Sequence, residues 1–262
     1  MDIEKLYRFS DGTERPLDRL PDDGGFCGIF RTVGFIGDSL ASGEFESTDE
    51  DGNRGYHDMF PYSWGQFMAR DCGFTAYNFS QGGMSAKWYM DSFADEKGFW
   101  DTDKLCQAYV LALGVNDILN AKQTVGSEAD IDLSDWRHNN RETFAGSYAA
   151  IVQRLREMQP RARFFFVTMP RDENGSRSPA HTAFLYRLAE LIPHSYVIDL
   201  DRYAPVYDAA FRKQFFLGGH MSPAGYRFTA KLMEAYIDFI IRHNMQDFKD
   251  VGFIGTDLKA PE

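Results

Sequence analysis

Five short apolar runs alternate along the chain with longer segments in which apolar residues recur every three or four positions. Each run is apolar at consecutive positions, which is typical of strands in a parallel sheet covered on both faces. The runs are Thr32–Gly37, Phe74–Phe79, Ala108–Leu113, Arg163–Met169 and Tyr196–Leu200. They predict a parallel sheet of five strands.

Helical spacing lies between and after these runs. One helix is predicted before Pro160, with its apolar stripe at Tyr148, Ile151, Val152 and Leu155. The last helix is expected to follow Ser222-Pro223, a cap residue and a first-turn proline, with its stripe at Met233, Tyr236, Ile237, Ile240 and Ile241. Pro61–Arg70 and Pro179–Leu191 also fit helices. This alternation predicts a three-layer α/β domain with right-handed crossovers.

Three segments do not follow the alternation. Residues 1–30 are expected to form an extension packed on the sheet's edge, beside a main domain of residues 31–262. Residues 41–60 are predicted to be a long polar loop, and Asn120–Arg141 a second long connection. Both leave the carboxyl ends of strands, so both are expected to wall a substrate cleft.

The composition and charge of the chain limit which partners it can bind and in which compartment it is expected. Charged residues make up 26% of the 262 residues, and the net charge of −11 argues against nucleic acid or an anionic membrane as partner. No apolar run approaches the roughly 18 residues of a membrane helix, and the charged amino terminus indicates a cytoplasmic protein. Cys27, Cys72 and Cys106 are too scattered for a zinc site or a disulfide framework, so packing is their expected role.

Polar residues follow several of the predicted strands. The first strand ends in Gly37-Asp38-Ser39-Leu40, at the edge where open α/β sheets bind ligands, so Ser39 is a candidate nucleophile. His220, between a Gly-Gly pair and the last helix, is suited to exchange a proton with it.

The second and third strands bring candidate oxyanion donors. Gly83 and Asn116 follow them and offer a backbone and an amide N–H. Each residue type is also common in ordinary turns and caps, the expected role of Asp38 and Asp117. Their joint occurrence at successive strand ends favours a catalytic site.

These blocks, Gly37–Leu40, Asn78–Gly83, Gly114-x-Asn116-Asp117 and His220, resemble the four blocks of the SGNH/GDSL hydrolases over residues 32 to 240 or so. The resemblance implies a flavodoxin-like α/β/α sandwich of sheet order 2-1-3-4-5. It also implies Ser39 as nucleophile, His220 as general acid/base, and an oxyanion hole of the Ser39 N–H, the Gly83 N–H and the Asn116 side chain. No metal or organic cofactor is required.

One position departs from the family pattern. An aspartate usually stands three residues before the histidine, and here that residue is Leu217. The favoured interpretation is a Ser-His dyad in which a backbone carbonyl near Leu217 or Gly218 orients His220. The alternatives are a carboxylate from elsewhere, such as Asp199 or Asp201, or the loss of hydrolysis.

The expected reaction is hydrolysis of a small-molecule carboxylic ester through an acyl-enzyme. The family habit and aromatic residues expected to line the cleft favour a short acyl group on a carbohydrate; those aromatics are Tyr56, Trp64, Trp88, Tyr89 and Trp100. Lipid or thioester hydrolysis, a non-catalytic ligand-binding module and a flavin-binding flavodoxin-like protein remain alternatives.

Overall fold

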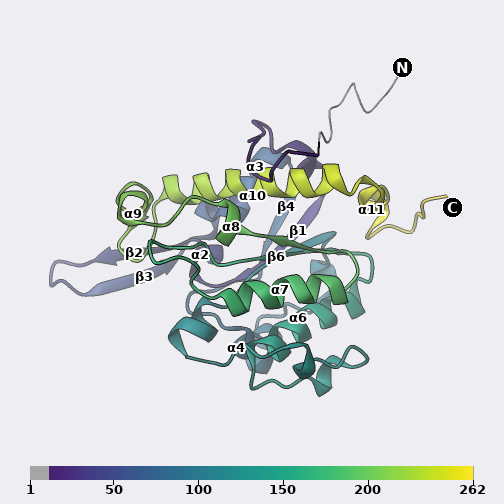
Figure 1. Cartoon of the computed structure of the whole chain (residues 1–262), viewed down its shortest axis with the longest axis horizontal. Coiled ribbons are helices and arrows are strands. Elements are labelled where there is room, and N and C mark those ends of the chain that lie inside the picture. Colours follow the sequence, from purple (N-terminus) through teal and green to yellow (C-terminus); the bar gives the residue numbers. More distant parts are fainter. Residues whose placement is uncertain (1–11, 262) are drawn as a thin grey trace.

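The computed structural model describes residues 12–261 and centres on a five-stranded parallel sheet (Figure 1). The strands are β1 (Thr32–Gly37), β4 (Thr75–Asn78), β5 (Ala108–Ala112), β6 (Arg163–Val167) and β7 (Ser195–Ile198). Their spatial order is β4-β1-β5-β6-β7. The five predicted strands and the predicted order, 2-1-3-4-5 in chain order, are confirmed.

Helices cover both faces of the sheet, as the three-layer prediction requires. The helices α3 (Trp64–Cys72) and α10 (Pro223–His243) pack on one face, and α6 (Phe144–Met158) and α7 (Pro179–Leu191) pack on the other. The shorter helices are α2 (Ser39–Ser42), α4 (Ala86–Trp88), α5 (Ala94–Glu96), α8 (Leu200–Tyr203), α9 (Ala209–Phe215) and α11 (Met245–Phe248). Short 3-10 or π turns span Gly25–Ile29, Phe60–Tyr62, Tyr89–Phe93, Thr102–Lys104, Val115–Asn120, Glu128–Asp130, Trp136–His138 and Val251–Phe253.

Side-chain caps fix where the long helices begin. The hydroxyl of Ser222 accepts a hydrogen bond from the Gly225 N–H at the start of α10, as predicted from Ser222-Pro223. Helix α3 starts at Trp64 instead of Pro61, because Phe60–Tyr62 forms a 3-10 turn that ends at the capping Ser63.

The unbroken apolar pattern of the strands follows from burial on both faces. In β6, Phe165 faces the cluster under α3 and α10, whereas Phe164 and Phe166 face the cluster under α6 and α7. All three side chains are fully buried. Alternate residues therefore enter different cores, so phenylalanine is buried at all three positions. Arg163, at the start of the strand, is the polar exception and is also buried.

The prediction of a loop over residues 41–60 is wrong. The strands β2 (Glu44–Thr48) and β3 (Arg54–Asp58) form an antiparallel hairpin that projects from one end of the molecule (Figure 1). A second, very short hairpin joins β8 (Phe216–Leu217) to β9 (His220–Met221). Both hairpins stand next to the carboxyl end of the sheet, where the candidate residues lie.

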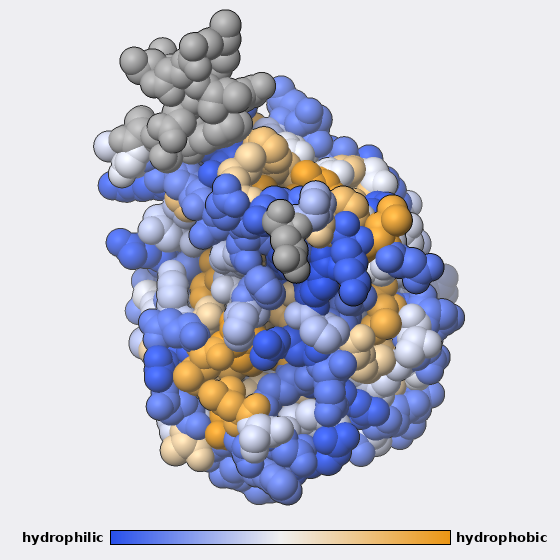
Figure 2. Space-filling model, turned by 90° about the vertical axis from the view of Figure 1, so that its right-hand side faces the viewer, coloured by the Kyte–Doolittle hydropathy of each residue, from blue (hydrophilic) through white to orange (hydrophobic). Residues whose placement is uncertain are grey.

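The opposite end of the molecule carries α11 and the C-terminal segment. Hydrophilic residues cover most of that face, and its hydrophobic residues form separate patches (Figure 2). Within residues 12–261, no helix has the length and apolar character needed to cross a membrane.

The predicted extension lies only partly within the described residues, because residues 1–11 are outside them. Its turn at Gly25–Ile29 packs on α10, where the Phe26 N–H donates to Asp238 at 2.8 Å and Cys27 contacts the Glu234 carbonyl. The domain boundary at residue 30 remains a prediction. All three cysteines are free, and Cys27 and Cys106 are buried.

Candidate functional site

One open pocket of about 570 Å³ brings together the four residues selected from the sequence. Ser39 opens α2 directly after β1, Gly83 lies in the turn after β4, and Asn116 lies in the turn after β5. His220 comes from β9, immediately before α10. All four line this pocket, although they are up to 181 positions apart in the sequence, from Ser39 to His220.

The turn that carries Ser39 is held by its neighbour Asp38. This carboxylate accepts a hydrogen bond from the Leu40 N–H at 3.1 Å and caps α2, as predicted for Asp38. Burial of the side chain raises the pKa of Asp38 to about 6. Ser39 is thus placed at the first turn of a short helix, with its backbone fixed on both sides.

Besides the Ser39 N–H, two groups at the pocket can donate hydrogen bonds to a developing oxyanion. Gly83 has a φ of 75°, a conformation that favours glycine, and its N–H donates to none of the described residues. The Asn116 amide donates to the Met84 carbonyl at 2.9 Å and accepts from Asn120 at 2.7 Å. These bonds fix the orientation of the amide and leave its second N–H hydrogen available.

Asp117 has the structural role predicted for it. Its carboxylate is fully buried and accepts from the Ala86 N–H at 2.8 Å, which ties the turn after β5 to the start of α4. Burial raises the pKa of Asp117 to about 6.

The imidazole of His220 is held by a glutamate from the first hairpin. Its Nδ1 lies 2.8 Å from Oε1 of Glu46 in β2, and the Gly219 N–H donates to the same oxygen at 2.7 Å. The hydrogen bond with His220 lowers the pKa of Glu46. Tyr56 of β3 packs its ring edge-on against the imidazole, with ring centres 6.0 Å apart.

Glu46 replaces the orienting groups expected from the sequence. Leu217, at the family's aspartate position, is 49% exposed. Asp199 is engaged by Thr168, Tyr186 and the Arg202 N–H, and Asp201 by Ser176 and Thr182. The favoured backbone carbonyl is therefore wrong. The alternative, a carboxylate from elsewhere in the chain, is the one that the structure has, but this carboxylate belongs to Glu46 and not to Asp199 or Asp201.

A second glutamate of the hairpin faces the other nitrogen of the same ring. Oε1 of Glu44 lies 3.0 Å from Nε2 of His220. Burial raises the pKa of Glu44, and the nearby positive potential of His220 opposes that rise. Asp58, at the end of the hairpin, accepts from the Gly82 N–H and the Ser42 hydroxyl. The hairpin thus contributes three carboxylates around the pocket.

Of the five aromatic residues predicted to line the cleft, Tyr56 lines the open pocket and Trp64 lines a smaller cavity that adjoins it. Tyr89 is buried beside Trp100, and Trp100 packs against Arg154. Trp88 is exposed away from the pocket. These three side chains are excluded because helical or loop positions near a strand end face the core as readily as the cleft. Tyr207 and Phe216 line the pocket instead, with the arginines Arg177 and Arg212.

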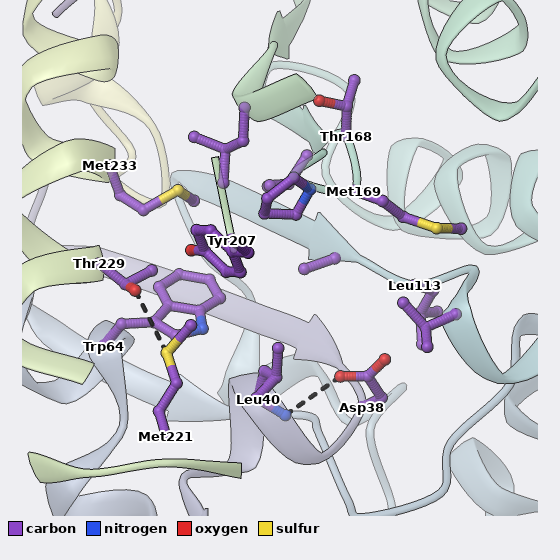
Figure 3. Close-up of a pocket in the computed structure, with 15 residues that line it drawn as sticks. Asp38, Leu40, Trp64, Leu113, Thr168, Met169, Tyr207, Met221, Thr229 and Met233 are labelled. Carbon is purple, nitrogen blue, oxygen red and sulfur yellow. Dashed lines mark hydrogen bonds between the residues drawn. The ribbon is translucent and has the colours of Figure 1, made fainter. Parts of the chain in front are cut away.

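A smaller, mostly apolar cavity of about 70 Å³ lies under the Ser39 turn (Figure 3). It shares five lining residues with the open pocket, namely Asp38, Leu40, Val115, Pro170 and Tyr207. Trp64, Met221 and Met233 form part of its inner wall. Within residues 12–261, no group of three or more His, Cys, Asp or Glu side chains is arranged to hold a metal ion.

Comparisons with known proteins agree with this fold. A search of curated proteins finds no match to the chain. Among solved structures, a Lactobacillus plantarum protein is 16% identical with a TM-score of 0.58, over 80% of this chain and 97% of that one. A family two carbohydrate esterase from Clostridium thermocellum, in complex with cellohexaose, is 14% identical with a TM-score of 0.56, over 83% of this chain and 65% of that one.

A third structure, a carbohydrate esterase family 2 enzyme with a carbohydrate binding domain from Corynascus thermopiles (Myceliophthora fergusii), is 15% identical with a TM-score of 0.54, over 88% of this chain and 70% of that one. At such identities these likenesses show the fold alone. The model of the GDSL-like lipase/acylhydrolase family, in contrast, matches residues 35–228, which include Ser39, Gly83, Asn116 and His220. The chain therefore belongs to the GDSL-like lipase/acylhydrolase family and is a carboxylic ester hydrolase.

Proposed function

We propose that the protein is a serine esterase that removes a short acyl group from a carbohydrate. The observation that carries the proposal is that His220 shares the pocket of Ser39 and has its Nδ1 held by Glu46 at 2.8 Å. A carboxylate in this position fixes the imidazole tautomer and stabilises the imidazolium that forms when serine loses its proton. Such an arrangement argues for catalysis over a binding module that has lost hydrolysis.

The reaction proceeds in two steps through an acyl-enzyme. Oγ of Ser39 attacks the ester carbonyl carbon while its proton passes to Nε2 of His220, and the carbonyl π electrons move onto the oxygen. The N–H groups of Ser39 and Gly83 and the amide of Asn116 bind that oxyanion. The bond to the alcohol oxygen then breaks, and this oxygen takes the proton from His220.

Water then releases the acyl group by the same route. His220 takes a proton from the water, which attacks the acyl carbon, and Ser39 leaves with that proton. Because Nε2 faces Glu44 in the structure, the imidazole has to exchange this carboxylate for the hydroxyl of Ser39 or of the leaving group. Glu44 is therefore a competitor for the reacting nitrogen in the resting protein.

The shape of the site favours a short acyl group. The cavity under Ser39 is about 70 Å³, which is about half of the roughly 150 Å³ of a cavity that binds benzene. A short acyl chain, of acetyl to butyryl size, therefore fits this space. The rings of Tyr56, Tyr207 and Phe216 on the open pocket offer surfaces for sugar stacking, and the fold is shared with the two carbohydrate esterases.

The test is hydrolysis of p-nitrophenyl esters from acetyl to octanoyl, together with release of acyl groups from acylated oligosaccharides followed by NMR. Ser39→Ala is expected to lower kcat by at least about 10³-fold. Ser47→Ala is the matched control, because the Ser47 hydroxyl binds His57 outside the pocket. Full activity of Ser39→Ala would overturn the nucleophile, and hydrolysis of only long lipid esters would overturn the substrate class.

A further inference from the structure

Two arginines stand on the wall of the pocket that contains Ser39 and His220. Arg177 comes from the connection between β6 and α7, and Arg212 comes from α9. They are separate in sequence and in secondary structure, so one local motif does not account for both.

Neither guanidinium is paired with a carboxylate of the described residues. Within residues 12–261, Arg177 makes no hydrogen bond or ion pair, and Asp38 and Asp172 influence it only through longer-range charge. Arg212 donates from Nε to the Tyr207 carbonyl at 3.3 Å and lies 5.0 Å over the ring of Phe216. Other arginines of the chain, such as Arg227 with Asp71 and Arg187 with Glu128, do have carboxylate partners.

The two cations also act on each other. Burial, together with the positive charge of Arg212, lowers the pKa of Arg177. Two partly buried like charges that are not paired with a carboxylate destabilise each other, and an anion placed between them relieves this cost. A guanidinium matches the geometry of a carboxylate or phosphate with two parallel hydrogen bonds.

We propose that Arg177 and Arg212 bind an anionic oxygen group, a carboxylate or a phosphate, on the alcohol part of the ester. This inference rests on the proposed function, because it takes the pocket of Ser39 as the place where the ester binds. The apolar cavity is suited to the acyl chain, so the arginines on the open pocket are placed to contact the sugar part of the ester. The substrate class is then an acylated acidic sugar, such as an acylated uronate or sugar phosphate.

The experiment compares three esters that carry the same acyl group: an O-butyrylglucose, the matching O-butyrylglucuronate and the matching O-butyrylglucose 6-phosphate. We expect kcat/KM for one of the anionic esters to exceed that for the neutral ester by about 10- to 100-fold. The difference between the two anionic arms identifies carboxylate or phosphate as the group recognised. Added NaCl is expected to reduce the preference, since an ion pair at an open pocket is screened.

Variants separate recognition from folding and chemistry. Arg177→Gln and Arg212→Gln are each expected to lower the ratio of anionic to neutral kcat/KM by at least about 10-fold, chiefly through KM. Lys213→Gln is the matched control, because Lys213 neighbours Arg212 on α9 but is exposed and does not line the pocket. This control is expected to keep the ratio of the unchanged protein.

The failure of this inference differs from the failure of the proposed function. If Ser39 is required for hydrolysis but the neutral ester is processed as well as both anionic esters, the arginine site is wrong and the esterase stands. If Ser39→Ala stays active, the proposed function fails. The anion site is then still tested by calorimetric titration of glucuronate and glucose 6-phosphate, and equal affinity in the unchanged protein and Arg177→Gln overturns it.

Discussion

At His220, a single imidazole meets two carboxylates, one at each ring nitrogen. The two glutamates stand two positions apart on β2 but lie in different environments. Glu46 is hydrogen bonded to His220, which lowers its pKa, whereas burial raises the pKa of Glu44. When the environments of two neighbouring carboxylates move their pKa values in opposite directions, the two groups usually have different roles. Glu46 is suited to hold the His220 ring in place through Nδ1. Glu44 is suited to give up its contact with Nε2 of the same ring when substrate enters.

The first prediction concerns Glu46 as a positioning residue. Glu46→Gln is expected to lower kcat by about 10²- to 10⁴-fold with a small change in KM, because the amide does not stabilise the imidazolium. Steady-state kinetics on a p-nitrophenyl ester measure both constants, and Glu46→Asp is expected to restore part of kcat. Glu50→Gln, in the exposed hairpin turn, is the control. Loss of KM alone, with kcat preserved, would contradict the role.

Asp38 gives a prediction of pH-dependent stability. Its pKa is raised from 3.8 to about 6 in the folded protein. The unfolded chain therefore releases this proton first as pH rises, and the free energy of unfolding falls between about pH 4 and pH 6. Asp38→Asn keeps an oxygen for the Leu40 N–H but has no proton to lose. It is expected to be more stable than the unchanged protein at pH 8, by on the order of 3 kcal/mol at most.

Urea unfolding at pH 4 and at pH 8 checks this prediction for Asp38. The gain in the free energy of unfolding is expected at pH 8 and not at pH 4. An equal effect at both values of pH would show that the charge of Asp38 is not the cause.

At the scale of elements, the sequence predicts those strands and helices whose pattern of apolar residues is set by burial alone. The run Arg163–Met169 reads as a strand because Phe164, Phe165 and Phe166 are all buried, and the cap at Ser222 marks the start of α10. The hairpin β2–β3 has no such signal, because most of its residues are polar and β3 is largely exposed. Asp51-Gly52, a common turn dipeptide, was the local sign available.

Because the hairpin has no clear signal in the sequence, the role of Glu46 cannot be predicted from the sequence either. Its role depends on the pairing that brings β2 beside Gly219 and His220, which are more than 170 residues away in the chain. The spacing of residues within one strand or helix cannot predict a contact between segments so far apart in the chain. The strand-end residues Ser39 and Asn116 were predictable because a parallel sheet places its carboxyl ends together.

Helix α10 offers a prediction on acyl-chain length. Met233 lines the cavity under Ser39, whereas Ile237, one turn further along, lines a separate small cavity in the core. Met233→Ala enlarges the space available to the acyl chain, so the ratio of kcat/KM for the octanoyl and butyryl esters is expected to rise. The rise is about fourfold for each additional methylene that becomes buried.

Ile237→Ala is the matched control for Met233→Ala. Both side chains are buried on the same helix, and each truncation is expected to cost about 2–5 kcal/mol of stability. Only Met233→Ala should change the chain-length ratio, measured at a temperature at which both variants are folded. The same ratio in both variants would show that the acyl chain lies outside this cavity.

At the scale of the whole molecule, the segment after α11 closes the end of the sheet opposite the pocket. Arg31 donates to the carbonyls of Gly252 and Ile254, at 2.7 and 2.9 Å, and Gln107 donates to the Val251 carbonyl at 2.9 Å. These donors precede β1 and β5, so the segment spans two neighbouring central strands. It therefore stabilises the frame that holds the strand ends of the site in register.

Asp250 contributes the ion pairs between this C-terminal segment and the sheet, so removing its carboxylate tests whether the segment stabilises the protein. It pairs with Arg163 at 2.8 Å and Arg161 at 2.7 Å, and Arg163 is only 2% exposed. Asp250→Ala leaves a buried guanidinium with carbonyl partners alone, so the free energy of unfolding is expected to fall by about 2–3 kcal/mol at pH 7.

Burial opposes ionisation of Asp250, but the hydrogen bond and charge of Arg161 and the charge of Arg163 outweigh this effect and lower the pKa of Asp250. Its contribution is therefore present above pH 4 and is lost as pH falls through the lowered value. Urea unfolding at pH 7 measures the effect, with the exposed Asp257→Ala as control. A change below about 0.5 kcal/mol, the usual limit for surface substitutions, would mean that the carbonyls alone satisfy Arg163 and that the closure does not depend on Asp250.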